Sequence, residues 1–198
     1  MLAPKIQTLE SLLAEIRACR VCEKHIEPRP VLRASLTARI LIAGQAPGTR
    51  VHESGIPYDD PSGNRLREWM GIGPGIFYDE RRVAIVPMGF CFPGQDDNGA
   101  DLPPRPECAK LWHARLMEQL PRFALSLYVG SYSQRWHLGG RAKPSLTETV
   151  AAWRDYTPKA IPLPHPSWRN NAWLKKNPWF EKELLPYLRR AVSRALSR

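Results

Sequence analysis

Three short segments of the chain combine side chains that could act on a bound molecule. Residues 44–48 read Gly-Gln-Ala-Pro-Gly, a rigid turn with two glycines whose backbone can approach a ligand closely. Residues 58–63 hold an aromatic ring, two carboxylates and a hydroxyl immediately before a predicted helix. Residues 165–171 read His-Pro-Ser-Trp-Arg-Asn-Asn and follow a predicted strand. An imidazole and a carboxylate in one pocket could supply electrostatic and general acid–base catalysis.

The four cysteines have a spacing that is typical of a metal site. Cys19 and Cys22 form a Cys-x-x-Cys pair, and Cys91 and Cys108 follow with sixteen residues between them. A reducing compartment keeps thiols reduced, so the spacing of these cysteines points first to metal binding. Four thiolates suit both tetrahedral zinc and a four-iron cluster, so the spacing does not distinguish the two.

Alternating strand and helix patterns predict the framework that positions these loops. Short apolar runs predict buried strands at residues 39–43, 83–86, 125–129 and 160–163. Helices are predicted at residues 6–18, 63–70, 106–120, 146–156 and 178–196. This order predicts an α/β fold of three layers, α/β/α, in which helices cover both faces of a central, mainly parallel four-stranded sheet. Functional loops are then expected at the carboxyl ends of the strands.

The composition indicates a folded and basic protein. The 198 residues fit one domain spanning residues 1–198, and 43% hydrophobic against 24% charged residues exclude a fully disordered chain. Lys and Arg number 29 against 19 Asp and Glu, and the net charge of +10 favours a polyanionic partner such as nucleic acid. With no secretory pattern after Met1 and no apolar run of membrane-spanning length, we expect a cytoplasmic protein without a membrane partner.

Taken together, the three loops and the cysteines resemble the uracil-DNA glycosylase superfamily. The first motif of that family is a Gly-Gln/Glu-x-Pro loop, matched by residues 44–47, and its second is a His-Pro-Ser loop after the last strand, matched by residues 165–167. The cysteine pattern resembles the cluster ligands of the iron-sulfur branches, families four and five. The resemblance extends from Cys19 to the helix after Ser167. It implies a structural 4Fe-4S cluster in preference to zinc.

The resemblance implies that the loops act on one base of DNA. An enzyme that acts on a base inside a duplex must rotate the base out of the stack and hold it in a pocket. Tyr58 would stack on the base, and Gln45 and Ala46 would contact it. The candidate catalytic residues are Asp60, which would orient water near the sugar, and His165, which would donate to the uracil O2 as charge builds there.

Four further residues are candidate DNA contacts. Ser62 and Ser167 are small hydroxyls next to Gly or Pro, where the backbone is open to a phosphate. Trp168 follows the His-Pro-Ser motif and would wedge into the stack that the extruded nucleotide leaves. Arg169 would hold a phosphate or a groove edge.

The chain departs from the family's patterns at three positions. The common DNA-uracil enzymes carry Asp where Ala46 stands, and the cluster branch carries Glu where Gln45 stands, so neither usual motif carboxylate is present. The cluster branch reads the pyrimidine edge with an Asn four residues before its third cysteine. This chain has Pro87 there, which has no side-chain donor. Base selectivity must then come from other groups, such as the main chain around Gln45 and Ala46.

Together these features predict a monomeric, monofunctional DNA-repair glycosylase that needs no nucleotide cofactor. It would hydrolyse the N-glycosidic bond of deoxyuridine in uracil-containing DNA and leave an abasic site. Pro87 leaves open a glycosylase of the same fold for hypoxanthine or xanthine. The missing carboxylates leave open a protein that binds abasic or damaged DNA without hydrolysis. A redox or zinc-organised module that never touches DNA would leave the loop at residues 165–171 unexplained.

Several of these residues also have purely structural interpretations. Asp59 and Asp60 could form a solvated turn or cap the helix that follows. Trp168 could be a packing residue. Residues 175–198 fit a solvated, basic helix face. Four histidines are predicted to be loop residues without a function, namely His25, His52, His113 and His137.

Overall fold

Four short strands form one parallel sheet at the centre of the fold. The computed structural model describes residues 7–197, and its strands are β1 (Ile40–Ala43), β2 (Val83–Ile85), β3 (Leu125–Val129) and β4 (Ala160–Leu163). Their order is β2-β1-β3-β4, and every neighbouring pair is parallel. The predicted four-stranded α/β sheet is confirmed, and it is wholly rather than mainly parallel.

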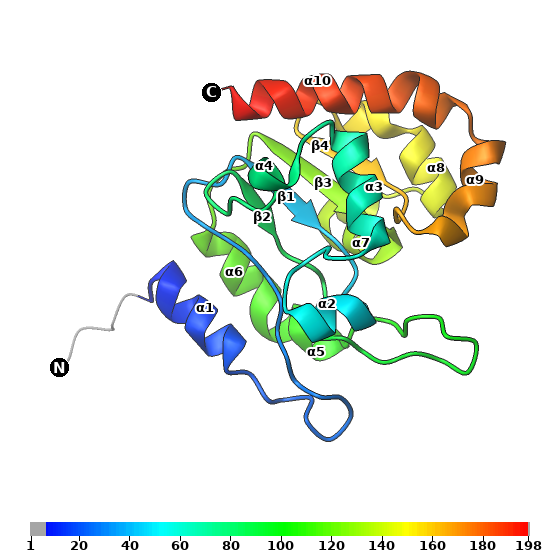
Figure 1. Ribbon diagram of the computed structural model, residues 1–198. Helices are drawn as coiled ribbons and strands as arrows, with labels where there is room; N and C mark the ends of the chain where they lie inside the picture. The colour runs from blue at the N-terminus through cyan, green and yellow to red at the C-terminus, as the bar shows by residue number, and fades with distance from the viewer. Residues whose placement is uncertain (1–6, 198) are drawn as a thin grey trace.

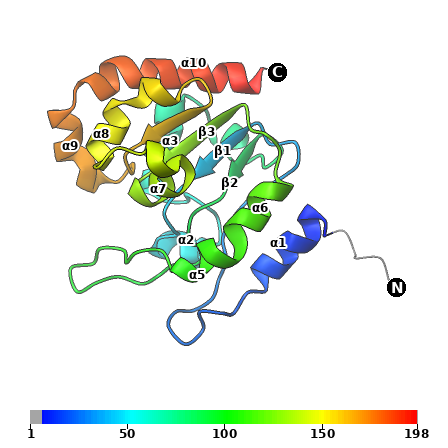
Figure 2. The ribbon, with the colours of Figure 1, turned by 180° about the vertical axis from the view of Figure 1, so that it is seen from behind.

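Alternate strand residues face two separate hydrophobic cores. Ile40 and Ile42 pack in the core shared with α3 (Pro61–Met70), α8 (Leu146–Ala151) and α10 (Leu185–Leu196). Leu41 and Ala43 pack in the core shared with α1 (Leu9–Arg17) and α6 (Ala114–Gln119). Figure 1 shows α10 along one side of the sheet and α1 and α6 on the other, and Figure 2 shows the same layers from behind. Helices therefore cover both faces, as buried parallel strands require.

Sequence signals at the helix ends explain where the predicted helices begin. The Thr8 hydroxyl caps α1 by accepting from the Ser11 N–H, and Ser145 caps α8 in the same way from Glu148. Predicted residue Ile6 lies outside the described residues. The α3 helix has Asp60 as its cap and a proline at its first position, and it ends at Gly71 in the left-handed region.

Several helices differ in detail from the prediction. The helix predicted at residues 106–120 is α5 (Pro106–Cys108), a π-helical segment Ala109–His113, and α6. A 3-10 helix Trp153–Tyr156 follows α8, and a π-helical segment Phe180–Leu184 leads into α10. Short helices that the sequence did not predict are α2 (Thr49–Ser54), α4 (Pro74–Phe77), α7 (Ser131–Leu138) and α9 (Asn171–Lys176), with 3-10 turns at Gly139–Arg141 and Trp168–Asn170. Such short segments carry too few apolar residues to show a helical period.

We predicted that four histidines lie in loops. This prediction was wrong for three of them, which lie in helical segments: His52, His113 and His137. His113 is fully buried and stacks on Phe90 at 5.2 Å between ring centroids. Its Nε2 donates to the carbonyl of Pro87 at 2.8 Å. His137 stacks on Tyr128 at 4.5 Å. Burial lowers the pKa of both imidazoles, that of His137 to about 3, so both are neutral at neutral pH.

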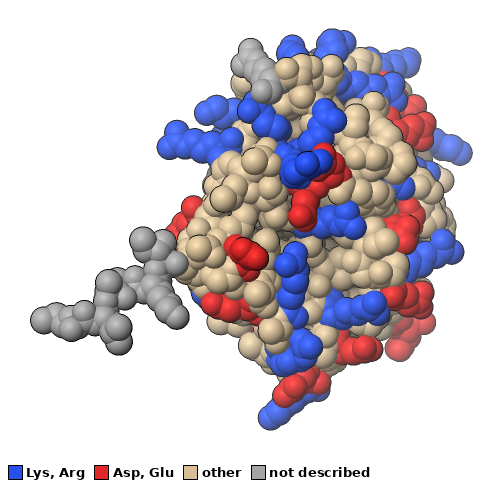
Figure 3. Space-filling view, turned by 60° about the vertical axis from the view of Figure 1, so that its left-hand side comes forward, with Lys and Arg blue, Asp and Glu red and all other residues tan. Residues whose placement is uncertain are grey.

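The surface charge is distributed rather than gathered in one patch on the face seen in Figure 3. Lys and Arg side chains spread over that face, with Asp and Glu between them (Figure 3). The exposed side of α10 carries arginines, including Arg194, while Leu188 and Val192 on its other side are buried. The basic carboxyl-terminal segment is thus a solvated helix face over residues 185–196, as predicted. Among the described residues, no helix is long and apolar enough to cross a membrane.

Candidate active site

Two adjoining cavities lie at the carboxyl ends of the strands. The outer one has a volume of about 540 Å³ and the inner one about 110 Å³. Eight residues line both, and they come from all three predicted segments and one further loop: Gln45, Ala46, Gly48, Asp60, Ser62, Asp101, His165 and Ser167. The predicted convergence of the three segments on one crevice is therefore confirmed. It lies beyond the carboxyl end of β1. The strand order places β2 on one side of β1 and β3 on the other, so the chain reverses its direction across the sheet at β1. Such a switch point is the usual place for a ligand in an open α/β sheet.

The loop after β1 forms the floor of the inner cavity. Its Gly44 and Gln45 carbonyls accept hydrogen bonds from the N–H groups of Met88 and Gly89 at 3.0 and 2.9 Å, which fix it to the segment after β2. Pro87, from that same segment, also lines the inner cavity. The carbonyl of Gln45 is thus already bonded. The groups of this loop that can still bind a ligand are its N–H groups and the Gln45 side chain.

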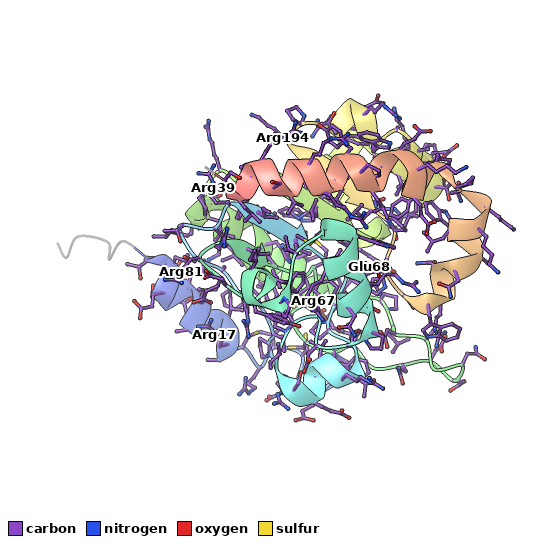
Figure 4. All side chains as sticks on the ribbon, turned by 45° about the horizontal axis from the view of Figure 1, so that its top comes forward. Arg17, Arg39, Arg67, Glu68, Arg81 and Arg194 are labelled. Carbon is purple, nitrogen blue, oxygen red and sulfur yellow. The ribbon has the colours of Figure 1, made fainter. Side chains whose placement is uncertain are left out.

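Tyr58 forms one wall of the inner cavity and is held in an unusual backbone conformation. Its φ is 57°, in the left-handed region that non-glycine residues seldom adopt. Its carbonyl accepts from the Tyr78 hydroxyl at 3.1 Å and from Arg67 at 3.4 Å, and its ring meets Phe77 edge-on at 6.0 Å. In Figure 4, Arg67 lies on the side of α3 toward the middle of the molecule and Glu68 on the other side. Burial raises the pKa of the Tyr58 phenol, which therefore stays neutral.

Asp60 is both a helix cap and a cavity residue. Its Oδ1 accepts from the Gly63 N–H at 2.8 Å and caps α3, and the residue lines both cavities. Ser62, in the first turn of the same helix, also lines both cavities. Asp59 is exposed and lines neither. The interpretation of Asp60 as a helix cap is therefore confirmed. The second oxygen of its carboxylate takes no part in the bond to Gly63.

His165 follows β4 and lies at the junction of the two cavities. The Asn170 side chain donates to its carbonyl at 2.7 Å, and Arg65 donates to the Ser167 carbonyl at 3.0 Å, so the loop is held from two sides. Burial lowers the pKa of the His165 imidazole, while the carboxylates of Asp60 and Asp101 oppose that change. The imidazole is therefore neutral at neutral pH and can donate one hydrogen bond to a developing negative charge.

Trp168 and Arg169 stand at the rim of the outer cavity. The Trp168 side chain is 68% exposed, so it is not a packing residue. The Arg169 guanidinium lies over its ring at 5.4 Å from the centroid. An exposed indole next to a cation is a surface that a nucleobase or a phosphate can meet.

Asp101 is a cavity residue that the sequence motifs missed. It lies in the loop between β2 and α5, which extends from the body of the protein below α9 in Figure 1. Gln95 donates to its Oδ1 at 3.1 Å, and Arg169 donates to the Gly99 carbonyl at 3.0 Å, which joins this loop to the loop after β4. No motif contains Asp101, and the only sequence signal was its place in a polar loop between two cysteines.

The four cysteines carry free thiols. Cys22, Cys91 and Cys108 are buried, and Cys19 is half-buried. Burial raises the pKa of the Cys91 thiol to about 12, and the neighbouring thiols of Cys108, Cys19 and Cys22 act in the same direction. Hydrogen bonds from the backbone of Arg29 to Cys91 and of Phe90 to Cys108 oppose the change. Within residues 7–197, no group of three or more His, Cys, Asp or Glu side chains has the geometry of a metal site. The donor set itself, thiols with N–H groups directed at the sulfurs, suits a thiolate-ligated metal group.

The fold and the crevice define an α/β protein with a ligand site at the carboxyl ends of its parallel strands. Residues 33–189 match the family model of the uracil DNA glycosylase superfamily, and the chain belongs to that superfamily of DNA glycosylases, which act on DNA. The matched residues include the whole lining of the outer cavity and the inner lining except Val31. They include Cys91 and Cys108 but not the first cysteine pair.

Proposed function

We propose that this protein is a monofunctional uracil-DNA glycosylase. It hydrolyses the N-glycosidic bond of deoxyuridine in DNA, releases uracil and leaves an abasic site for later repair enzymes. The observation that carries the proposal is the meeting of Tyr58, Asp60 and His165 at an inner cavity of about 110 Å³ that adjoins a wider cleft. A small pocket that adjoins a wider cleft matches the need to hold one extruded base while the DNA strand remains outside.

The inner cavity is the proposed base pocket. The Tyr58 ring offers an apolar wall on which the base stacks, and Gln45 and Ala46 approach its edge. His165 donates a hydrogen bond to the uracil O2. That bond strengthens as the base departs as an anion, so it stabilises the transition state more than the ground state.

The sugar is then attacked by water. The C1′–N1 bond breaks and its electron pair leaves with the base. The oxygen of water forms the new bond to C1′, and the water loses one proton as it does so. The Asp60 carboxylate orients this water and favours the positive charge that builds on the sugar. Its fixed position as the cap of α3 keeps the carboxylate in place without reorganisation.

The outer cavity is the proposed DNA groove. Ser62 and Ser167 line it and hold phosphates next to the extruded nucleotide. The exposed Trp168 ring fills the gap in the base stack, and Arg169 binds a phosphate or a groove edge. The net charge of +10 supports binding to the DNA backbone and predicts a steep decrease of affinity with salt.

Four cysteines are the proposed ligands of a 4Fe-4S cluster, with zinc as the less favoured metal: Cys19, Cys22, Cys91 and Cys108. The cluster would tie the segment after α1 to the segment after β2 and to α5, and it would take no part in hydrolysis. The donor set supports the proposal, because four free cysteines, three of them buried, can supply the soft thiolate ligands that such a cluster takes. The proposal predicts a visible absorption band and stoichiometric iron in protein purified without oxygen. Both signals should fall in Cys91→Ser, and zinc in place of iron would contradict it.

The function is tested by single-turnover excision from matched oligonucleotides that carry one uracil, followed by alkali cleavage at the abasic site. Asp60→Asn and His165→Ala should each lower the rate at least about 100-fold, the usual range for such groups. The neighbouring Asp59→Asn removes the same charge from an exposed position outside both cavities and serves as the control. Equal rates for all three variants would overturn the assignment of the catalytic pair. A native protein that binds uracil-containing or abasic DNA but never cleaves would overturn the enzymatic proposal.

Pro87 favours a second candidate substrate. It lines the inner cavity and offers no side-chain donor to a pyrimidine edge, so hypoxanthine or xanthine is an alternative base. Oligonucleotides that differ only in this base separate the two, and inert uracil beside an excised purine would select the alternative.

A further inference from the structure

We infer that Asp101 is a second catalytic carboxylate of this site and accepts the proton of the attacking water. The inference rests on the proposed function, since it assigns a group to the hydrolysis of the glycosidic bond. It assigns separate tasks to the two carboxylates of the crevice. Asp60 orients the water and favours the charge on the sugar, while Asp101 receives the proton.

The position of Asp101 fits this task. It lines both cavities, as Asp60 and His165 do, so it lies where the base pocket opens into the cleft. It is exposed to that cleft in the free protein, which leaves its carboxylate open to water. The Asp101 carboxylate also acts on the imidazole of His165, in the same direction as Asp60, which places both carboxylates near one ring.

One hydrogen bond to its carboxylate and the backbone bonds beside it hold Asp101 in place. Gln95 and Asp101 form an isolated antiparallel bridge, and the Gln95 side chain donates to Asp101 Oδ1 at 3.1 Å. The Leu102 N–H donates to the Gly94 carbonyl at 2.9 Å, which closes the base of the loop. The second oxygen, Oδ2, lies 3.3 Å from the position that a Cβ atom would take on Gly48, so the carboxylate packs against the loop after β1.

The tip of this loop is also held in place. Asp96 Oδ1 accepts from the N–H groups of Asn98 and Ala100 at 3.0 and 2.8 Å. The Arg169 guanidinium donates to the Gly99 carbonyl at 3.0 Å, so the loop is joined to the segment that carries His165. Asp101 thus belongs to a loop that is held by its own internal hydrogen bonds and by Arg169.

The chemistry of the site leaves a task for a second carboxylate. Gln45 and Ala46 supply none from the loop after β1. One oxygen of Asp60 already accepts from the Gly63 N–H, which fixes the position of this carboxylate at the start of α3. In the completed step, the oxygen of water bonds to C1′, its proton passes to the Asp101 carboxylate, and the base leaves with the electrons of the C1′–N1 bond. The proton then returns to solvent through the open cleft.

The test compares Asp101→Asn with Asp97→Asn in single-turnover excision and in binding to a duplex with an abasic site. Asp97 belongs to the same loop and is exposed, but it lines neither cavity, so its variant removes the same charge without touching the site. We expect Asp101→Asn to lower the excision rate constant about 100-fold or more, in the usual range for a general base. Its affinity for the abasic duplex should match that of Asp97→Asn, and Asp101→Glu should recover part of the rate.

This comparison distinguishes three outcomes that would overturn the proposals. A native protein without excision activity overturns the proposed function itself. Native activity with equal rates for Asp101→Asn and Asp97→Asn overturns only the role of Asp101. A loss of DNA binding in Asp101→Asn that accounts for its loss of rate, with no recovery in Asp101→Glu, shows that Asp101 only shapes the loop and also overturns the inference.

Discussion

The hydroxyl oxygen of Tyr58 lies 2.7 Å from the position that a Cβ atom would take on Gly44. The two residues belong to different loops, one after β1 and one before α3, and their contact closes a corner of the inner cavity. The backbone of Gly44 does not have a positive φ, so its conformation alone does not demand glycine. Glycine is required here because any side chain would displace the tyrosine ring.

The first prediction follows from this contact. Gly44→Ala should lower the single-turnover excision rate at least about 10-fold, because displacement of a positioning group by about 1 Å costs up to about 100-fold. Gly75→Ala is the control, since a Cβ atom there meets nothing within 4 Å. Both variants should show the same circular dichroism spectrum as the native protein. An unchanged rate in Gly44→Ala would show that the Tyr58 wall does not hold the base.

The parts of the fold that the sequence predicted are those that depend on local patterns. The strands carry continuous apolar runs because both of their faces are buried, and the helix after Asp60 carries a cap and a proline at its start. The loops at Gly44 and His165 follow directly from strand ends, so a parallel sheet brings them to one edge. Their convergence was therefore predictable from the order of the strands.

The parts that were missed depend on contacts between distant residues. Asp101 reaches the crevice because of its bond with Gln95 and the bond between Arg169 and Gly99, which are seventy residues apart in the chain. His137 stacks on Tyr128 of β3, and the short α7 helix that carries it has no strong apolar period. No local pattern of residue types encodes either contact.

A second prediction concerns stability. A Cβ atom on Gly63 would collide with the carbonyl oxygen of Tyr58, and this oxygen belongs to the backbone and cannot rotate away. Gly63→Ala should therefore lower the free energy of unfolding by about 1–3 kcal/mol, the usual cost of overpacking. Urea denaturation measures this difference. Gly140→Ala, where a Cβ atom meets nothing within 4 Å, should stay within about 0.5 kcal/mol of the native protein.

A third prediction concerns the pH dependence of stability. Burial, and next the nearby His113, lower the pKa of His137 from 6.5 to about 3 in the folded protein. Between these pH values the unfolded chain binds a proton that the folded protein does not, so the free energy of unfolding decreases as the pH falls through this window. His137→Phe keeps a ring against Tyr128 and removes the titrating group. Its stability should therefore decrease less than that of the native protein between pH 7 and pH 5.

The difference is measured by urea denaturation at both pH values. One proton changes the slope by at most about 1.4 kcal/mol for each pH unit. Burial also lowers the pKa of His113 and His165, so part of the native slope should remain in His137→Phe. His25→Gln replaces an exposed imidazole and is the control. Equal slopes in His137→Phe and the native protein would contradict the assignment of a neutral His137 in the folded protein.

The last prediction separates duplex from single-stranded DNA. If the exposed Trp168 ring fills the gap left by the extruded base, its removal should matter only where a base stack must be closed. Trp168→Ala should lower kcat/KM about 10-fold on duplex DNA with one uracil, within the range of about 1–3 kcal/mol for base–aromatic stacking. The loss on a single strand should be smaller, because the flanking bases are already free.

Trp136→Ala provides the matched control for this experiment. Trp136 is also partly exposed, at 39%, but it lies beside His137 on α7 and lines neither the inner nor the outer cavity. Its variant should therefore excise uracil from both substrates at the native ratio, at an ionic strength held constant because binding to DNA depends steeply on salt. Equal losses on duplex and single strand in Trp168→Ala would mean that the indole binds the strand backbone or the flanking bases. A loss confined to the duplex would identify Trp168 as the group that replaces the extruded base in the stack.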